Sequence, residues 1–307
     1  MARGYHRGRQ FLLCCRGALG AGDLLQVLYD ARKAVRLTRL SRRGDARYLF
    51  VPLDHSVTSG PIAGRRDFDH LVRKVVDGGA DGIVLHKGRV RALDPHLFIE
   101  CSIIVHLSAS TVYAPDSHEK VLVGEVEEAV RIGADAVSIH VNVGSLSEAA
   151  QLADFGAVAA ACDRWSIPLM AMMYPSGPGI PAAVDATQLA HLANIAVDLG
   201  ADIVKTPAPQ QVEDLVSVVA SCPIPIVVGG GQADGRSLLD FAGKALAAGC
   251  RGLAIGRRVF QDPEPDAVVR SLATLVHPRQ GRRAGSGQLP EPAGDSGCDG
   301  PASGALR

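Results

Sequence analysis

The chain has 307 residues, 47% of them hydrophobic, and its 32 basic side chains balance its 32 acidic ones. This length and apolar fraction are enough for one large core or two ordinary domains. A formal net charge of zero gives no reason to expect nucleic acid or an anionic membrane surface as a partner. No apolar stretch approaches the ~20 residues that a transmembrane helix needs, so a membrane partner is not expected either.

The seven cysteines are scattered along the chain, are odd in number and lack the spacing of metal ligands. Most of them lie in or beside apolar runs, which is typical of reduced core residues. We therefore expect a cytoplasmic protein without a metal site, and nothing in the sequence calls for a cofactor.

The two ends of the chain differ in composition from the middle. Residues 1–22 are basic, and Arg16 interrupts their short apolar stretch, so a disordered extension is favoured over a signal peptide. Residues 278–307 are rich in Gly, Pro and Ser, which predicts a second disordered tail. One folded domain, residues 23–277, is expected between them.

Between the tails, apolar runs of strand length alternate with helical patterns. Several of the runs are continuously apolar, as strands covered on both faces are. The segment between the second and third strands is ambiguous. Strands are predicted at residues 48–53, 81–86, 101–107, 134–141, 167–173, 201–205, 224–229 and 251–256. Helices are predicted at residues 68–78, 119–133, 146–166, 183–200, 210–222, 237–249 and 266–276.

A short sequence echo joins four of the predicted helices to the strands that follow them. It reads GGADG, IGADA, LGADI and AGCRG, and glycine just after a helix is a common helix stop. This weak internal repeat, together with eight strand-like runs, predicts an α/β protein with a (β/α)8 TIM barrel. A doubly wound sheet would carry its phosphate fingerprint after the first strand, whereas here the glycine-rich turns follow the seventh and eighth strands.

Polar and ionisable side chains follow the apolar strands one after another. In a (β/α)8 barrel, catalytic residues collect at the carboxyl ends of the strands. Lys205 ends the sixth predicted strand, where burial disfavours the ammonium form and makes the amine a usable nucleophile toward a carbonyl. Asp54 follows the first strand and Tyr174 the fifth, and both types of side chain can move protons in such a reaction. The sequence therefore predicts a Schiff-base site.

Glycine-rich turns supply the other half of the predicted site. The backbone N–H groups of Gly230, Gly231 and Gly256 can hold a phosphate at the loops after the last two strands, and Arg257 adds positive charge. A Schiff base needs no metal, which agrees with the lack of metal-ligand spacing.

Each of these residues also has a purely structural interpretation. Lys205 can be a surface lysine or the partner of a core carboxylate, Asp54 can cap a loop or a helix, and Tyr174 can simply pack in a turn. Lys87 is a competing Schiff-base lysine, but it lies in a loop-like HKG segment and ranks below Lys205. The histidines near strand ends are expected to be hydrogen-bonded core residues, namely His86, His106 and His140.

The chain resembles the archaeal-type, Schiff-base class I aldolases. The similarity covers residues 48–277 and rests on several motifs in combination. They are VPLDHSVTSGPI, VLHKG, IVHLSAST, VEEAVRIGADAVSIHVNVGS, PLMAMMYPSG, LGADIVKT, VVGGG and AIGRRVF.

The resemblance implies roles for individual residues. Lys205 matches the Schiff-base lysine of the family, Tyr174 its proton-donor tyrosine and Asp54 its acid/base aspartate. The implied partners are a sugar phosphate and an aldehyde, and we expect a homo-oligomer. The implied substrate-binding residues are Asp54, His55, Ser56, Val57, Thr58, Tyr174, Pro175 and Ser176, with Gly230, Gly231, Gly256 and Arg257 in the phosphate loops.

Within this family, the PLDHSV and HLSAST forms look similar to members in antibiotic-producing bacteria. Those members join L-aspartate 4-semialdehyde to dihydroxyacetone phosphate. The resemblance thus implies synthesis of a seven-carbon amino keto sugar phosphate for aromatic or secondary metabolism. The alternatives are a transaldolase-type reaction that gives 2-amino-3,7-dideoxy-D-threo-hept-6-ulosonate, a fructose-bisphosphate aldolase, and a barrel that binds a sugar phosphate without turnover.

The chain departs from the family pattern at three loops. Ser176 stands where many members have arginine, which removes one anion contact. Pro207 and Pro209 change the loop beside Lys205, and the GGGQADG turn lacks the usual basic residue. These changes leave the choice of substrate open.

Overall fold

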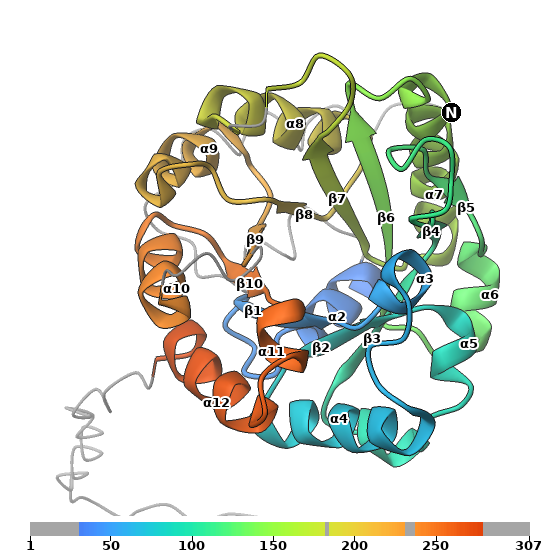
Figure 1. The fold of residues 1–307 in the computed structure, drawn as a ribbon, viewed down its shortest axis with the longest axis vertical. Coiled ribbons are helices and arrows are strands. Elements are labelled where there is room, and N and C mark those ends of the chain that lie inside the picture. Colours follow the sequence, from blue (N-terminus) through green and yellow to red (C-terminus); the bar gives the residue numbers. More distant parts are fainter. Residues whose placement is uncertain (1–30, 182–183, 231–236, 279–307) are drawn as a thin grey trace, which may run out of the picture.

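A computed structural model describes residues 31–181, 184–230 and 237–278, and it confirms the predicted barrel (Figure 1). Eight parallel strands close into a ring in the order β1-β10-β9-β8-β7-β6-β3-β2. The predicted tails, apart from residue 278, lie outside the described residues. The strands of the ring are β1 (Tyr48–Pro52), β2 (Gly82–Leu85), β3 (Ser102–His106), β6 (Ala136–Val143), β7 (Leu169–Pro175), β8 (Ile203–Thr206), β9 (Ile226–Gly229) and β10 (Gly252–Ala254).

Helices surround the ring and alternate with its strands. The glycines of the sequence echo stop four helices in the left-handed conformation, for example with φ of 96° at Gly79 and 94° at Gly200, where glycine is favoured. In the part of the chain that the structure describes, no helix is long and apolar enough to cross a membrane. The helices around the ring are α3 (His55–Ser59), α4 (Arg65–Gly78), α5 (Lys87–Val90), α6 (Val126–Arg131), α7 (Glu148–Trp165), α8 (Ala186–Asp198), α9 (Leu215–Ser221), α10 (Leu238–Ala247), α11 (Arg257–Phe260) and α12 (Pro265–Val276), with 3₁₀ turns η1 (Pro95–Phe98) and η2 (Val212–Asp214).

Strand side chains divide between two cores, because successive residues of a strand point to opposite faces. In β8, Val204 packs outward in the core beneath the helices, whereas Ile203 packs inside the barrel. The same alternation turns Lys205 inward, two residues above Ile203. The barrel interior is filled by Tyr48, Phe50, Val84, Ile104, Ala136, Met170, Met172, Ile203, Val227 and Ala254.

A helix that the sequence analysis did not predict, α2 (Ala31–Arg39), closes the amino-terminal end of the barrel. Leu37 and Leu40 are almost fully buried and pack against the interior layer. Lys33 is 2.8 Å from Asp163 and 3.2 Å from Asp202, which precedes β8. Figure 1 shows α2 through the middle of the ring.

The aspartates of the sequence echo tie neighbouring strands together at this end. The carboxylate of Asp81, just before β2, accepts the backbone N–H of Leu49 in β1 at 2.6 Å. In the same way, Asp135 accepts a backbone N–H of β3 at 3.0 Å, and Asp202 accepts a backbone N–H of β7 at 2.8 Å. Before β10 the echo has Arg251, whose guanidinium donates to backbone carbonyls that precede β1. The repeat is therefore a set of strand-to-strand links.

His277, just after α12, joins the end of the barrel to its beginning. Its Nδ1 lies 2.8 Å from Asp45 and its Nε2 lies 2.8 Å from Asp81. Burial by itself lowers the pKa of this histidine, but the hydrogen bonds and charges of Asp81 and Asp45 outweigh burial and raise it. Two carboxylate partners suit the form in which both ring nitrogens carry protons.

The helix predicted at residues 119–133 is wrong over its first half. α6 begins only at Val126, and before it β5 (Val121–Leu122) pairs antiparallel with β4 (Ser108–Ala109). Two β-branched residues, Val121 and Val123, and then Gly124 disfavour a helix here. We call residues 108–122 the arm; it leaves the barrel beyond the carboxyl end of β3.

Candidate active site

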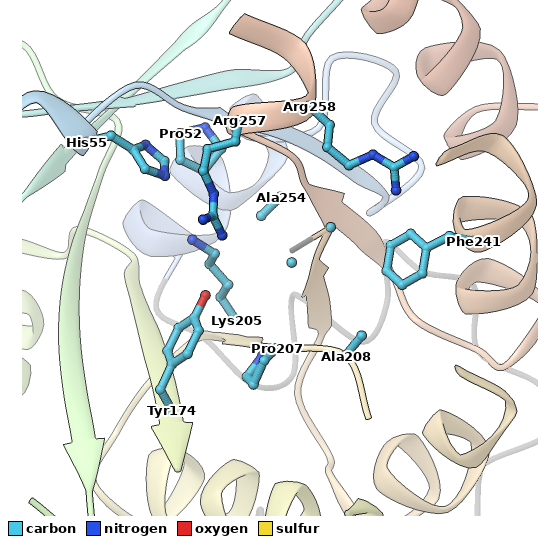
Figure 2. A pocket seen from close by; sticks show the side chains of 13 residues that line it. Pro52, His55, Tyr174, Lys205, Pro207, Ala208, Phe241, Ala254, Arg257 and Arg258 are labelled. Atoms are coloured by element: carbon cyan, nitrogen blue, oxygen red, sulfur yellow. The ribbon is translucent and has the colours of Figure 1, made fainter. Parts of the chain in front are cut away.

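A cavity of about 440 Å³ lies at the carboxyl ends of the strands (Figure 2). Six of its lining residues are site residues predicted from the sequence. They come from five different strand ends and reach one cavity only because the barrel closes. They are His55, Tyr174, Lys205, Gly230, Gly256 and Arg257, and the other lining residues are Pro52, Pro207, Ala208, Gly229, Phe241, Ala254 and Arg258.

Lys205 forms part of the cavity wall and is only 7% exposed. Its Nζ lies 3.6 Å from the sulfur of Met172 in β7. Among the described residues no carboxylate forms an ion pair with Lys205, so the structure does not support its interpretation as the partner of a core carboxylate. An amine held in this way at a cavity wall is available to a carbonyl carbon.

Tyr174 is placed beside Lys205 by the neighbouring strand β7. Its ring stacks on His140 of β6, with ring centroids 4.7 Å apart and an interplanar angle of 18°. A Cβ atom on Gly229 would lie 3.6 Å from the Tyr174 hydroxyl and 4.0 Å from Cε of Lys205. Glycine at this position therefore leaves the space between the two groups open, and Figure 2 shows the hydroxyl directed toward Lys205.

Asp54 occupies the N-cap position of α3, but its side chain accepts no capping hydrogen bond. Its Oδ1 lies 3.6 Å from Nδ1 of His55, and neither buried atom has a hydrogen-bond partner among the described residues. Burial alone would raise the pKa of Asp54, but His106, His55 and Lys205 outweigh burial and lower it. A buried, ionised carboxylate with an unused acceptor favours a role toward substrate over a role in capping.

Two histidines that the sequence analysis assigned to the core also belong to this site. Nε2 of His106 lies 3.9 Å from Asp54, and its Nδ1 lies 2.8 Å from the Ser138 hydroxyl. Burial lowers the pKa of His106 to about 4 and that of His140 to about 3, so both rings are neutral near pH 7. They are hydrogen-bonded as expected, but their closeness to Asp54 and Tyr174 depends on barrel closure.

The loops after β9 and β10 form the cationic end of the cavity. Gly230 and Gly256 line it beside Arg257 and Arg258. A Cβ on Gly256 would lie 2.8 Å from both the carbonyl oxygen of Pro52 and the His55 ring, so only glycine allows this close approach. Gly231 lies outside the described residues.

Several predicted substrate contacts, Asp54 among them, do not line the cavity. Ser56, Val57 and Thr58 continue α3 away from it, and Val57 is exposed. Pro175 ends β7, and the Ser176 hydroxyl lies 2.7 Å from Nδ1 of His118 in the arm. The serine that replaces the arginine of many family members thus contacts the arm.

Lys87, the competing lysine, lies apart from this cavity. Its Nζ lies 2.7 Å from the carboxylate of Glu128, and its side chain is 39% exposed. An exposed lysine with a carboxylate partner is a weaker nucleophile candidate than Lys205.

Within the described residues, no three His, Cys, Asp or Glu side chains come close enough together to hold a metal ion. Cys101, Cys162, Cys222 and Cys250 are all free, and all but Cys222 are buried. The other three cysteines lie outside the described residues.

Comparison with known proteins agrees with this geometry. A family model described as DeoC/LacD family aldolase matches residues 48–262. The chain is 49% identical over 247 residues to a 2-amino-4,5-dihydroxy-6-oxo-7-(phosphonooxy)heptanoate synthase of Streptomyces griseus, covering 80% of this chain and 90% of the relative. It is 39% identical over 254 residues to a 2-amino-3,7-dideoxy-D-threo-hept-6-ulosonate synthase of Archaeoglobus fulgidus, covering 82% and 93%.

Solved structures give the same assignment. The barrel superposes on a Schiff-base-forming fructose-1,6-bisphosphate aldolase with a TM-score of 0.72 and 25% identity, covering 79% of this chain and 99% of the other. The protein belongs to the DeoC/LacD aldolase family. It is a class I aldolase, of the type that works through a Schiff base.

Proposed function

We propose that this aldolase condenses dihydroxyacetone phosphate with L-aspartate 4-semialdehyde. The product would be 2-amino-4,5-dihydroxy-6-oxo-7-(phosphonooxy)heptanoate, a precursor for aromatic or secondary metabolism. The observation that carries the proposal is the position of Lys205, a buried amine between a phenol and a cationic loop pair. The name of the Streptomyces griseus relative supports the choice of substrates.

In this mechanism Lys205 supplies the nucleophile. The amine attacks the ketone carbon of dihydroxyacetone phosphate, and the carbonyl oxygen takes up a proton to give a carbinolamine. Loss of that oxygen as water leaves an iminium, which draws electrons from the neighbouring hydroxymethyl carbon. A proton leaves that carbon and the enamine forms. The enamine carbon then bonds to the aldehyde carbon, and water releases the product and frees Lys205.

Asp54 and Tyr174 are the proposed proton carriers. The ionised carboxylate of Asp54 can accept a proton as the carbinolamine and the enamine form, because its Oδ1 has no hydrogen-bond partner in the described residues. The Tyr174 hydroxyl faces Lys205 and can donate a proton to the new alkoxide once the carbon–carbon bond has formed. His140 holds the tyrosine ring by stacking.

The phosphate of the donor is assigned to the loops after β9 and β10. Gly230 and Gly256 expose backbone there, and Arg257 carries charge toward Lys205 in Figure 2. Loops at this place in a (β/α)8 barrel frequently bind phosphate. The donor would then lie with its ketone at Lys205 and its phosphate at Arg257.

A direct test combines trapping with product analysis. Borohydride should reduce the iminium and fix dihydroxyacetone phosphate on Lys205, and Lys205→Ala should abolish the adduct. Mass spectrometry of the reaction with L-aspartate 4-semialdehyde should then show the seven-carbon product. An adduct on Lys87 that survives Lys205→Ala would overturn the assignment, and a barrel that only binds sugar phosphate would give no adduct.

A second candidate is the transaldolase-type synthesis of 2-amino-3,7-dideoxy-D-threo-hept-6-ulosonate, which uses 6-deoxy-5-ketofructose 1-phosphate as donor. The 39% identity to the Archaeoglobus fulgidus synthase favours it. The two candidates share the acceptor and differ in the donor. Product assays with each donor in turn separate them, and fructose 1,6-bisphosphate cleavage tests the third alternative.

We further infer a cytoplasmic enzyme that works as a homo-oligomer, with residues 23–277 as its catalytic domain. Four free cysteines support the first part of this inference. Analytical ultracentrifugation would test the oligomer.

A further inference from the structure

Two basic regions face each other across the mouth of the barrel. In the ring order β1-β10-β9-β8-β7-β6-β3-β2, the pair β9–β10 stands directly opposite the pair β6–β3. Arg257 follows β10, whereas the arm follows β3 and carries Lys120. Lys205 in β8 and Tyr174 in β7 lie between these two walls.

The arm is fixed against β6 and α7 by hydrogen bonds that join residues distant in sequence. The Ser108 hydroxyl accepts the backbone N–H of His140 at 3.0 Å. The carbonyl oxygen of His118 accepts the side-chain amides of Asn142 at 2.7 Å and Gln151 at 3.0 Å. These links bring the arm beside the histidine on which Tyr174 stacks.

Lys120 is half-buried in this arm, and among the described residues one hydroxyl accepts its hydrogen bond. Its Nζ donates to the Ser110 hydroxyl at 2.6 Å, and no carboxylate of a described residue lies within ion-pair distance of it. An ammonium has three protons to donate, so an incoming acceptor group finds free donors. A partly buried ammonium with unused donors and no carboxylate at ion-pair distance can bind an anionic group.

The positive charge of Lys120 affects the pKa of two histidines at the barrel mouth. After burial, it is the largest cause that lowers the pKa of His140. It also lowers the pKa of His106, where burial, His86 and Lys205 contribute more and Asp54 acts in the opposite direction. Burial lowers the pKa of Lys120 itself, and the carboxylates of Asp54 and, to a smaller extent, Asp116 counteract this. Ser110, its hydrogen-bond partner, is two residues from Ser108, which accepts the N–H of His140, so the ammonium is near the catalytic wall of the mouth.

We propose that Lys120, supported by Ser110, binds the carboxylate of the acceptor aldehyde and makes the enzyme select carboxylated aldehydes. This inference rests on the proposed function. The proposed product carries a phosphate at one end of a seven-carbon chain and a carboxylate at the other. Opposite walls with Arg257 and Lys120 match these two ends, with the new bond formed between them near Lys205.

The test is a comparison of aldehydes in Lys120→Met, which removes the charge and keeps most of the side-chain length. The kcat/KM ratio for L-aspartate 4-semialdehyde over butanal should fall about 10- to 100-fold, the size of a lost hydrogen bond to a charged group. Succinate semialdehyde, which has the carboxylate without the amino group, should show the same fall. Lys120→Arg should keep most of the selectivity, and Lys244→Met, on the exposed face of α10, should keep all of it.

The outcomes separate this inference from the proposed function. An unchanged kcat/KM ratio in Lys120→Met overturns the carboxylate site. If the ratio is unchanged because both aldehydes lose the same factor in kcat/KM, Lys120 acts on the chemistry instead. Borohydride trapping of dihydroxyacetone phosphate on Lys205 is measured in every variant and should persist. If dihydroxyacetone phosphate forms no borohydride adduct with the wild type, the proposed function is wrong. The kcat/KM ratio of the two aldehydes is then measured with a ketose phosphate that does form the adduct.

Discussion

Replacing Tyr174 by phenylalanine isolates the contribution of one hydroxyl group. The ring stacks on His140 with centroids 4.7 Å apart, and phenylalanine keeps this contact. The hydroxyl has no hydrogen-bond partner among the described residues, so its removal leaves no buried group unsatisfied. We expect the free energy of unfolding to change by less than about 0.5 kcal/mol, as for substitutions that disturb no buried contact.

The effect on the rate should be much larger than the effect on stability. Proton transfer by a positioned side chain contributes roughly 10²- to 10⁴-fold. A loss of about 100-fold corresponds to roughly 2.7 kcal/mol in the activation free energy, at 1.36 kcal/mol for each factor of ten. Trapping of the donor on Lys205 should persist in Tyr174→Phe, while product formation fails.

Asp54→Asn provides the contrasting phenotype. Asparagine keeps the shape of the side chain but removes a charge that lies 3.6 Å from His55 and 3.9 Å from His106. Iminium formation itself should slow, so the borohydride adduct on Lys205 should diminish. Time-resolved trapping, a product assay and a thermal melt on both variants measure the difference. Full activity in Tyr174→Phe would refute the reasoning and leave the tyrosine with packing alone.

Three further predictions concern stability, metals and the chain ends. His277→Ala should lower the free energy of unfolding by about 3 kcal/mol near pH 6. This is the low end of the range for breaking a buried ion pair, because the carboxylate of Asp81 keeps its backbone hydrogen bond. Because the pKa of His277 is raised in the folded protein, the stabilisation by its ion pairs is complete below about pH 6.5, the ordinary pKa of histidine. It is lost as the pH rises through the pKa that His277 has in the folded state. The difference in the free energy of urea unfolding between wild type and His277→Ala should therefore shrink from pH 6 to pH 9. His70→Ala, at an exposed position, is the control, and a difference that grows with pH would contradict the ion pair. Exhaustive chelation should leave turnover intact, and loss with EDTA that zinc restores would point to a metal-dependent mechanism. A chain trimmed to residues 23–277 should keep its turnover; if it folds but is inactive, a tail reaches the site.

The barrel could be predicted from the sequence because its signals are local. Continuous apolar strands and glycine helix stops recur along the chain, and each is readable within about ten residues. The strand-end position of Lys205 followed from the same pattern. The first half of the helix predicted at 119–133 failed because the apolar spacing there also fits the short strand Val121–Leu122.

The rest of the site depends on contacts between distant residues. His118 and Ser176 are 58 positions apart, and His106 and Ser138 are 32 apart. Helix α2 was missed because only its Leu37 and the adjacent Leu40 enter the barrel, which is too few for a clear helical period. Only closure of the ring shows that Lys120 and Arg257 belong to facing walls.

The closed amino-terminal end of the barrel has a consequence for the enamine. Within the described part of the chain, the packed interior layer and α2 lie between Lys205 and solvent at that end. Water that protonates the covalent intermediate must then enter through the same mouth as the aldehyde. A seated acceptor should shield the reactive carbon, so in deuterated water the exchange of the donor's carbon-bound hydrogen should fall as the aldehyde concentration rises.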